Sequence, residues 1–159
     1  MKDSFERVID YMRISITDRC NLRCRYCMPE DIAFIPHEEI MTYEELLRLT
    51  RLFAGQGIRK IKITGGEPLV RRGCVDFIRS LKEIEGISNV TITTNGVLLE
   101  QYMDDLAKAG IDGINISLDT LRADSYEKIT GRNEFGRVWR GIVKAIESGI
   151  RIKLNCVPV

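Results

Sequence analysis

The sequence predicts a single α/β domain built on a parallel sheet. Its 159 residues are the length of one domain, and short β-branched runs alternate with longer helical patterns along them. The runs themselves alternate apolar and polar residues, whereas strands covered by helices on both faces read as continuous apolar stretches. We therefore expect either a curved sheet whose uncovered face lines a wet cavity, or a sheet with one face open to water.

The expected strands and helices follow one another along the chain. Strands are predicted where β-branched residues cluster, at residues 11–17, 58–64, 90–94, 113–118 and 150–157. Helices are predicted where apolar residues recur at helical spacing before a glycine, at residues 42–55, 73–86, 99–110 and 138–149. The first helix has the clearest start, because Thr42 and Glu45 have the spacing of a capping box. The stretch between the fourth strand and the last helix is less regular.

Alternation places the polar residues of the five strands on one face of the sheet. Its charged members are Arg13, Lys60, Lys62, Arg151 and Lys153, against the single acid Asp119. We expect this face to favour an anionic ligand, although the whole chain carries a formal net charge of only +1.

Composition and hydropathy narrow the classes of protein that fit this chain. The near balance of 24 basic and 23 acidic residues argues against binding to bulk nucleic acid or to a membrane surface. No apolar run reaches the ~18 residues of a membrane span, and the first residues lack the apolar core of a signal peptide. The five cysteines are an odd number, so we expect free or metal-bound thiols in a reducing, cytoplasmic compartment.

Three cysteines directly follow the first predicted strand. Cys20, Cys24 and Cys27 have the spacing Cys-x3-Cys-x2-Cys, which lets one short loop present three thiolates to a metal centre. Soft thiolates select iron–sulfur clusters, zinc or copper(I). Three local ligands leave a fourth coordination position open, and an open position is typical of a reactive metal site rather than a structural one.

A structural zinc site is the alternative interpretation of the cysteine loop. It would need a fourth ligand, either another cysteine or His37, the only histidine of the chain. We expect instead that His37 is a solvated loop residue. We also expect Cys74 and Cys156 to be small core residues rather than ligands.

Polar and glycine residues follow the second, third and fourth strands. Ligands of parallel α/β sheets bind beyond the carboxyl ends of the strands, which is where these residues lie. The paired Gly65 and Gly66 would allow a ligand to approach the backbone closely, and Glu67 offers an acceptor for an amine. Residues 93–96 and 117–119 end the next two strands. The sequence therefore predicts one binding rim that these residues share with the cysteines.

Two strings of the sequence resemble known motifs. The cysteine loop and the turn Gly65-Gly66-Glu67-Pro68 together resemble the radical S-adenosylmethionine superfamily. The longer strings at residues 17–29, 63–69, 93–96 and 115–119 are similar to those of the GTP 3′,8-cyclase family, which acts in molybdenum cofactor biosynthesis. The resemblance runs over essentially all of residues 1–159, which it identifies as a radical S-adenosylmethionine core domain.

The resemblance implies a fold, two cofactors and a set of ligand residues. The fold would be a parallel-stranded partial (βα) barrel, truncated after about five strands. The cofactors would be a 4Fe–4S cluster held by Cys20, Cys24 and Cys27, and S-adenosyl-L-methionine, which the reduced cluster cleaves to a radical that attacks GTP. The remaining implied ligands are Tyr26, Gly66 and Ser117 for S-adenosyl-L-methionine, and Arg13, Lys62, Thr93 and Lys153 for GTP.

Lys62 departs from many members of the family, which carry an arginine at its position. It keeps the positive charge but lacks the two-pronged guanidinium, so we expect a looser contact with the triphosphate. All four implied GTP ligands lie on the polar face that alternation predicts independently.

The family's chains are about twice as long as this one and carry a second group of three cysteines in their C-terminal part. We therefore expect little or no GTP cyclisation from the 159-residue chain alone. The fifth strand would be an exposed edge, so we also expect self-association, including a homodimer. The reduced cluster would need an electron donor such as flavodoxin or ferredoxin. Two alternatives stay open: another radical S-adenosylmethionine enzyme that acts on a peptide or a sugar, and a non-catalytic metal-binding fragment.

Overall fold

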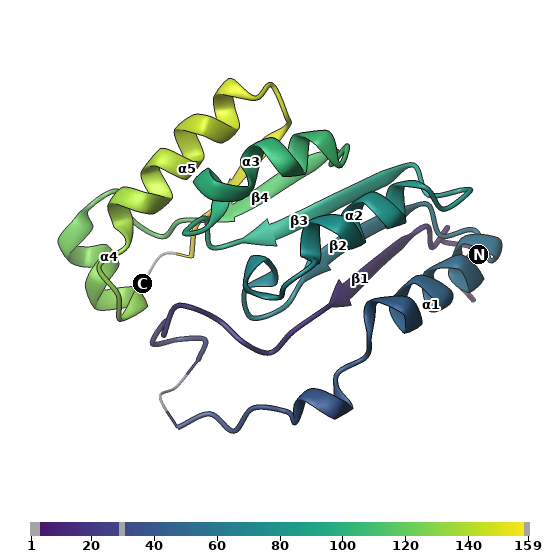
Figure 1. Cartoon of the computed structure of the whole chain (residues 1–159), viewed down its shortest axis with the longest axis horizontal. Coiled ribbons are helices and arrows are strands. Elements are labelled where there is room, and N and C mark those ends of the chain that lie inside the picture. The colour runs from purple at the N-terminus through teal and green to yellow at the C-terminus, as the bar shows by residue number, and fades with distance from the viewer. Residues whose placement is uncertain (1–3, 29–30, 158–159) are drawn as a thin grey trace.

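The computed structural model describes residues 4–28 and 31–157 and contains one five-stranded parallel sheet. Its strands lie in the order of the chain and are β1 (Tyr11–Ser15), β2 (Lys60–Thr64), β3 (Asn89–Thr94), β4 (Gly113–Ser117) and β5 (Ile152–Asn155). Each strand is parallel to its neighbour (Figure 1). Each connection between neighbouring strands is expected to be a right-handed crossover. Because every crossover adds the next strand in the same direction, the connecting helices all lie on one face of the sheet, and the other face is left uncovered. The partial (βα) barrel is thus confirmed.

The helices between the strands confirm the sequence prediction with one addition. They are α1 (Tyr43–Gly55), α2 (Cys74–Lys82), α3 (Leu99–Lys108), α4 (Ala123–Thr130) and α5 (Phe135–Glu147), with short 3-10 helices η1 (His37–Glu39) and η2 (Pro68–Val70). The capping box of α1 is present: the Thr42 side chain accepts from the Glu45 N–H at 3.2 Å, and the Glu45 carboxylate accepts from the Thr42 N–H at 2.7 Å. Helix α4 was not predicted, because it is short and buries only Tyr126 and Thr130.

The core lies between the apolar face of the sheet and the helices. Strands β1 to β4 contribute residues that are at most 7% exposed, namely Ile14, Ile61, Ile63, Val90, Ile92, Ile114 and Ile116. Helices α2, α3 and α5 cover them with Phe77, Ile78, Leu81, Leu99, Met103, Leu106, Val138, Ile142 and Ala145. Burial stabilises the fold by about 1.5–3 kcal/mol for each large apolar side chain. On the edge strand β5 the apolar alternation gives little burial, since Leu154 is 50% exposed.

The polar face of the sheet forms rows across the strands, set by the register of the pairs. Arg13 lies beside Lys62, and Lys62 lies beside Thr91. In the next row Asn115 separates Thr93 from Lys153. The residues predicted to share one face therefore do share it, and the uncovered face explains why these strands alternate.

Within the described residues, no helix is both long and apolar enough to cross a lipid bilayer. Two of the three predictions for isolated residues are confirmed: His37 is exposed in η1, and Cys74 is a buried core residue. The prediction for Cys156 is wrong. Its side chain is exposed, because it lies just beyond the end of the edge strand β5, where no helix covers it.

Candidate functional site

The cysteine loop leaves β1 and crosses the carboxyl ends of the other strands. Figure 1 shows this loop in dark purple, reaching from the tip of β1 to α4 at the far side of the sheet. Its first half is bonded to the turn after β2, where the Gly66 N–H donates to the Thr17 carbonyl at 2.7 Å. Its second half is bonded to the end of α4, where the Arg23 N–H donates to the Thr130 carbonyl at 2.9 Å. Both halves are thus fixed by backbone bonds.

Helix α4 holds the cysteine loop through backbone carbonyls at its C-terminal end, which have no hydrogen-bond partner within the helix. The last four carbonyls of a helix have no partner within it. Here the carbonyls of Ile129 and Thr130 accept from the N–H groups of Arg25 and Arg23, at 3.0 and 2.9 Å. The helix that the sequence pattern did not reveal is therefore the element that positions the cysteine loop.

The two glycines after β2 allow the turn that carries them to pack closely against the cysteine loop. A Cβ atom on Gly66 would lie 2.4 Å from the Arg19 carbonyl oxygen, and one on Gly65 would lie 2.6 Å from the Thr17 carbonyl oxygen. Side chains cannot be accommodated at such distances. The sequence predicted close approach of a ligand here, whereas the structure shows close approach of the cysteine loop. We call loop 16–28, turn 64–67, Asn95 and Asp119 the cysteine rim.

The three cysteines of the loop lie at the open side of the rim. Cys20 and Cys24 are half-buried and Cys27 is exposed, all as free thiols. Burial is the main cause that raises the pKa of Cys20, and it raises the pKa of Cys24 to about 11, with the neighbouring thiols adding to the effect. Bound metal would reverse this preference, because a metal ion stabilises the thiolate form.

The donor set fits an iron–sulfur cluster better than a single zinc ion. Among the described residues, no three histidine, cysteine or acidic side chains come together closely enough to share one metal ion. A cluster does not need them to, because each thiolate binds a different iron atom. Of the proposed completions of a zinc site, Cys74 is buried under the apolar face in α2 and His37 lies in η1. Cys156 lies nearer, because its Sγ donates to the Asp119 carbonyl at 3.5 Å, but it completes no group of three metal ligands among the described residues. The three soft, partly exposed thiols of the loop are therefore the ligands that remain for a metal centre, and they suit a cluster.

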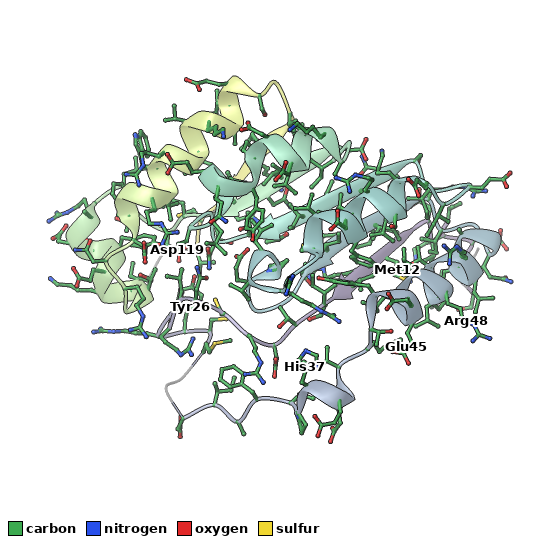
Figure 2. The ribbon with its side chains drawn as sticks, viewed as in Figure 1. Met12, Tyr26, His37, Glu45, Arg48 and Asp119 are labelled. Carbon is green, nitrogen blue, oxygen red and sulfur yellow. The ribbon has the colours of Figure 1, made fainter. Side chains whose placement is uncertain are left out.

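Tyr26 connects the cysteine loop to the end of β4. Its hydroxyl donates to Asp119 Oδ2 at 2.5 Å, and Asp119 Oδ1 accepts from the Val157 N–H at 2.9 Å. Figure 2 shows Tyr26 and Asp119 facing each other beyond the strand ends, with His37 on a separate segment. Burial and the Asp119 carboxylate raise the pKa of Tyr26, so the phenol keeps its proton and acts as a donor. A small cavity lies beside this pair, and Ser117, Cys24 and Asn95 also line it.

Glu67 is placed differently from its predicted role as an amine acceptor. Its side chain is fully buried, and its two oxygens accept from the Thr94 hydroxyl at 2.8 Å, the Asn95 N–H at 2.7 Å and the Leu69 N–H at 3.1 Å. Burial raises the pKa of the carboxyl, against the effect of the three donors. Since its oxygens face the protein, Glu67 holds the turns after β2 and β3 together and presents no oxygen to a ligand in this structure.

The cations of the polar face lie below the rim, toward the amino ends of the strands. We call Arg13, Lys62, Arg151 and Lys153 the cationic face. Lys62, Arg151 and Lys153 line a depression that runs across the sheet. In the part of the chain that the structure describes, none of the four makes an ion pair, whereas the nearby Lys60 pairs with Asp10 at 2.7 Å. Thr93 lies half-buried in the same row as Lys153, two residues before Asn95 of the rim.

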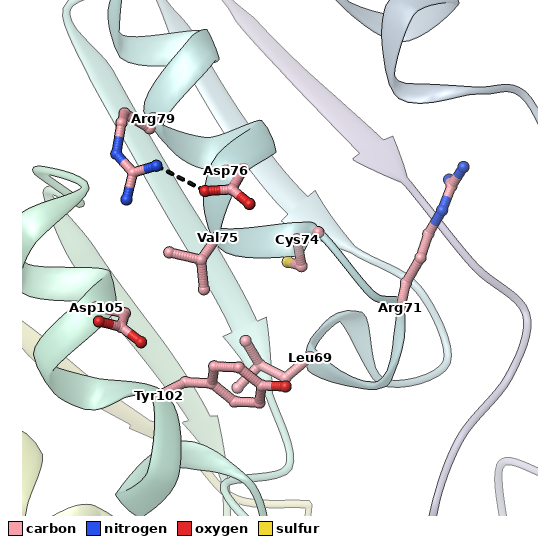
Figure 3. A pocket seen from close by; sticks show the side chains of 9 residues that line it. Leu69, Arg71, Cys74, Val75, Asp76, Arg79, Tyr102 and Asp105 are labelled. Carbon is pink, nitrogen blue, oxygen red and sulfur yellow. Dashed lines mark hydrogen bonds and ion pairs between the residues drawn. The ribbon is translucent and has the colours of Figure 1, made fainter.

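A second depression lies on the helical side of the sheet and has a different character (Figure 3). Leu69, Cys74, Val75, Asp76, Arg79 and Tyr102 are among the side chains that line it. Its clearest polar feature is the ion pair between Arg79 and Asp76 at 2.6 Å, which satisfies both charges. Burial raises the pKa of the Cys74 thiol to about 12, so this cysteine stays protonated and unreactive. We assign no ligand to this depression.

Several residues of the rim could not be identified from the sequence. The bonds of Tyr26 to Asp119 and of Arg23 to α4 join residues that are far apart in the chain. Spacing gives no signal for such pairs. Asn95 was recognised only as part of a strand end, yet its amide lies against Cys20 and Asn21.

Comparisons with known proteins agree on the fold and on one superfamily. The model of the family described as "Radical SAM superfamily" matches residues 14–159. The GTP 3′,8-cyclase of Petrotoga mobilis is 48% identical over 159 residues, which are 99% of this chain and 49% of that protein. Molybdenum cofactor biosynthesis protein 1 of Drosophila melanogaster is 49% identical over 158 residues, or 28% of its length. The chain thus spans about half, or less, of the curated relatives that it matches.

Solved structures of low sequence identity share the architecture. Streptococcus suis SuiB, crystallised with S-adenosylmethionine, superposes with a TM-score of 0.77 and 22% identity over 92% of this chain and 33% of that one. HydG, a maturase of the [FeFe]-hydrogenase, gives a TM-score of 0.73 and 18% identity over 92% of this chain and 34% of that one. At these identities the likeness establishes the fold alone.

Proposed function

This chain belongs to the radical SAM superfamily, and we propose that it forms the cofactor-binding part of a GTP 3′,8-cyclase of molybdenum cofactor biosynthesis. The observation that carries the proposal is the placement of two unlike features on one sheet. A loop of three thiols lies at the carboxyl ends of the strands, and a set of cations that have no ion pair among the described residues lies on the uncovered face below it. The first feature suits a metal cluster and the second suits a polyanionic substrate.

Cys20, Cys24 and Cys27 would hold a 4Fe–4S cluster. When bound, the reduced cluster and S-adenosyl-L-methionine supply a radical that can remove a hydrogen atom from the substrate. The chain's own contribution is to fix the loop through its bonds to turn 64–67 and to α4. Rigid placement matters because a reaction between oriented partners avoids much of the entropic cost of bringing them together.

Residues around the cavity of the rim would bind S-adenosyl-L-methionine. Ser117 and Tyr26 line the same cavity, from β4 and from the cysteine loop. Gly66 is exposed beside the loop; because its N–H donates to the Thr17 carbonyl, its own carbonyl is the backbone group that it would offer to a ligand. Tyr26 keeps its proton, as its raised pKa requires, and is oriented by the Asp119 carboxylate.

The cationic face would bind the triphosphate of GTP. Arg13 and Lys62 are neighbours across β1 and β2, and Lys153 approaches from β5 at the other edge of the sheet. Their charges repel one another while no anion is bound, so an anionic ligand relieves the repulsion as well as gaining attraction. Thr93 lies in the row of Lys153, the row of this face nearer the rim, where its hydroxyl would contact the nucleoside. Lys62 offers a point charge rather than a fork.

Three further parts of the proposal concern partners and location. The cluster would be reduced by a one-electron donor such as flavodoxin or ferredoxin. A homodimer could form through β5, which is an edge strand of the described sheet. A reducing compartment such as the cytoplasm is supported by the five free thiols.

Two measurements on the anaerobically reconstituted chain test the proposed function. The first is the content of iron and acid-labile sulfide, for which we expect about one cluster per chain on the three thiols of the loop. Zinc without sulfide would contradict the proposal. The second is calorimetric titration with GTP and, separately, with a peptide and a sugar. Preference for GTP is expected from the cationic face, whereas preference for the peptide or sugar would indicate another radical SAM enzyme.

A further inference from the structure

Asn95 lies outside the cysteine loop, yet its side chain donates a hydrogen bond to a cysteine sulfur of the rim. It follows β3, and its Nδ2 lies 3.7 Å from Cys20 Sγ and donates to Asn21 Oδ1 at 2.8 Å. The bond to sulfur joins residues that are far apart in the sequence. It is therefore a product of the fold and not of a local turn.

The orientation of the Asn95 amide is fixed by its second bond. Its Oδ1 accepts from the Val97 N–H at 3.0 Å. If the amide were turned over, its NH₂ group would face that N–H, and its oxygen would face both the Asn21 oxygen and the cysteine sulfur. The contact of the NH₂ group with the Val97 N–H and that of the oxygen with the Asn21 oxygen would then be repulsive. The network therefore allows only the orientation in which the NH₂ group points at Cys20.

Glu67 holds Asn95 in this position from inside the protein. Its buried carboxylate accepts from the Asn95 N–H at 2.7 Å and from the Thr94 hydroxyl at 2.8 Å. The Thr94 hydroxyl in turn accepts from the Gly96 N–H at 3.1 Å. These bonds fix the turn after β3 on both sides of Asn95, so a fully buried carboxylate that faces no ligand acquires a role at the rim.

The three cysteine sulfurs differ in the donors that they receive. Cys20 Sγ accepts from the Leu22 N–H at 3.4 Å as well as from Asn95 Nδ2 at 3.7 Å. The Cys24 sulfur is met by its own backbone N–H, and within residues 4–28 and 31–157 no side chain from outside the loop donates to the sulfur of Cys24 or Cys27. Among the described residues, Cys20 is thus the loop cysteine whose sulfur receives a side-chain donor from outside the loop.

We propose that Asn95 tunes the metal centre as a positioning residue: its Nδ2 donates to the Cys20 thiolate and raises the reduction potential of a cluster held by Cys20, Cys24 and Cys27. The inference rests on the cluster of the proposed function. Reduction adds negative charge to the cluster and its ligand sulfurs, and a donor directed at one of these sulfurs stabilises that charge. Glu67 supports this effect indirectly, by holding the turn that carries Asn95.

The test is a redox titration of the reconstituted chain without S-adenosyl-L-methionine or substrate, followed by electron paramagnetic resonance. Asn95→Leu removes the donor and should lower the potential. Asn95→Asp keeps the shape and the Val97 bond but places an oxygen against the sulfur, so it should lower the potential further. Asn89→Leu, at the opposite end of β3, is the matched control and should leave the potential unchanged. Glu67→Gln should give a smaller shift than either Asn95 variant.

Each outcome bears on one proposal only. Equal potentials for the parent and both Asn95 variants would overturn the tuning role, as would a potential that rises. Loss of the cluster from both variants, with the circular dichroism of the parent retained, would overturn it too, because Asn95 would then be needed for assembly. A parent chain that takes up no iron and sulfide would instead refute the proposed function.

Discussion

The cysteine rim and the cationic face use the same sheet in opposite ways. At the rim, several polar groups are joined to one another: Glu67 to the turn after β3, Tyr26 to Asp119, and the loop backbone to α4. Asp18 Oδ1 is buried there without a partner. On the cationic face, side chains of like charge lie in adjacent rows without acidic partners among the described residues. The rim is therefore held in place by internal bonds before a ligand arrives, whereas the charges of the cationic face are balanced only when an anion binds.

The difference follows from what each region must do. A metal cluster needs ligands in fixed positions, so a rim held by internal hydrogen bonds lowers the entropic cost of assembling them. A flexible polyanion can be bound by long, adjustable side chains such as lysine, which do not need fixed positions before the ligand arrives. Changes at the rim should therefore affect stability and metal content, whereas changes on the cationic face should affect affinity alone.

Removing a rim thiol should have the largest effect. We expect Cys24→Ala to lose the cluster, because two thiols of one loop cannot replace three. Iron and sulfide per chain, measured after anaerobic reconstitution, should fall to near zero. Cys156→Ser is the matched control, since Cys156 is an exposed thiol outside the loop, and it should keep the metal content of the parent. Full metal content in Cys24→Ala would show that the loop does not bind the metal.

The next largest effect is expected from a substitution in turn 64–67, because this turn packs closely against the cysteine loop. Gly66→Ala would place a Cβ atom 2.4 Å from the Arg19 carbonyl oxygen, and both belong to backbone that is held by hydrogen bonds. Relief of such overlap typically costs about 1–3 kcal/mol of the free energy of unfolding. Chemical denaturation of the metal-free chain should show this loss. If the rim is looser than the structure indicates, the two proteins will unfold at the same denaturant concentration.

A second glycine provides the control for this substitution. A Cβ atom on Gly55, at the end of α1, would have no atom outside its own helical turn within 4 Å, and its φ is not positive. Gly55→Ala should therefore stabilise the chain by about 0.4–1 kcal/mol, because it restricts the unfolded state. Opposite signs for the two glycine substitutions would establish that contact with the cysteine loop, and not glycine content, decides the result at the rim.

The same contrast explains how far the sequence could predict this structure. The periodicity of single residues gave the sheet, four of the five helices and the polar face, because burial on one side repeats along each strand. It gave the three cysteines through their spacing. Periodicity could not predict α4. This helix contributes through the backbone carbonyls of Ile129 and Thr130, which accept hydrogen bonds from the cysteine loop, and backbone groups leave no pattern in the sequence. Nor could periodicity show that Glu67 faces inward. A glutamate beside two glycines is equally consistent with a side chain that binds a ligand and with one that holds two turns of the protein together.

On the cationic face we expect a change in affinity without a change in stability. Lys62→Ala should weaken the binding of GTP about 10-fold, since a hydrogen bond to a charged group contributes about 1.5–3 kcal/mol and part of it is recovered by water and by Arg13. Lys62→Arg should strengthen binding, because the guanidinium can contact two phosphate oxygens. Calorimetric titration at two salt concentrations measures both, and Lys108→Ala, on α3, is the control.

Two results would argue against this view of the cationic face. An unchanged affinity of Lys62→Ala for GTP would remove Lys62 from the binding site. Affinity that does not fall with added salt would show that charge is not what holds the nucleotide, because interactions between exposed charges are screened. The free energy of unfolding should not fall in Lys62→Ala, because Lys62 has no ion pair among the described residues to lose and has Arg13, a like charge, as its neighbour across β1 and β2.

The smallest effect is expected from a thiol outside both regions, and it gives a baseline for the rim. Burial raises the pKa of Cys74 from its ordinary value of 9.0 to about 12, so folding favours the neutral thiol. The stabilisation from this preference is complete below about pH 9 and is lost as the pH rises from there toward 12. Iodoacetamide at pH 8 should alkylate the exposed Cys156 quickly and Cys74 only after denaturant is added, as mass spectrometry of peptides would show. Rapid alkylation of Cys74 in the folded chain would mean that α2 opens readily, and the rigid support that the rim shares with the turn before α2 would then be in doubt.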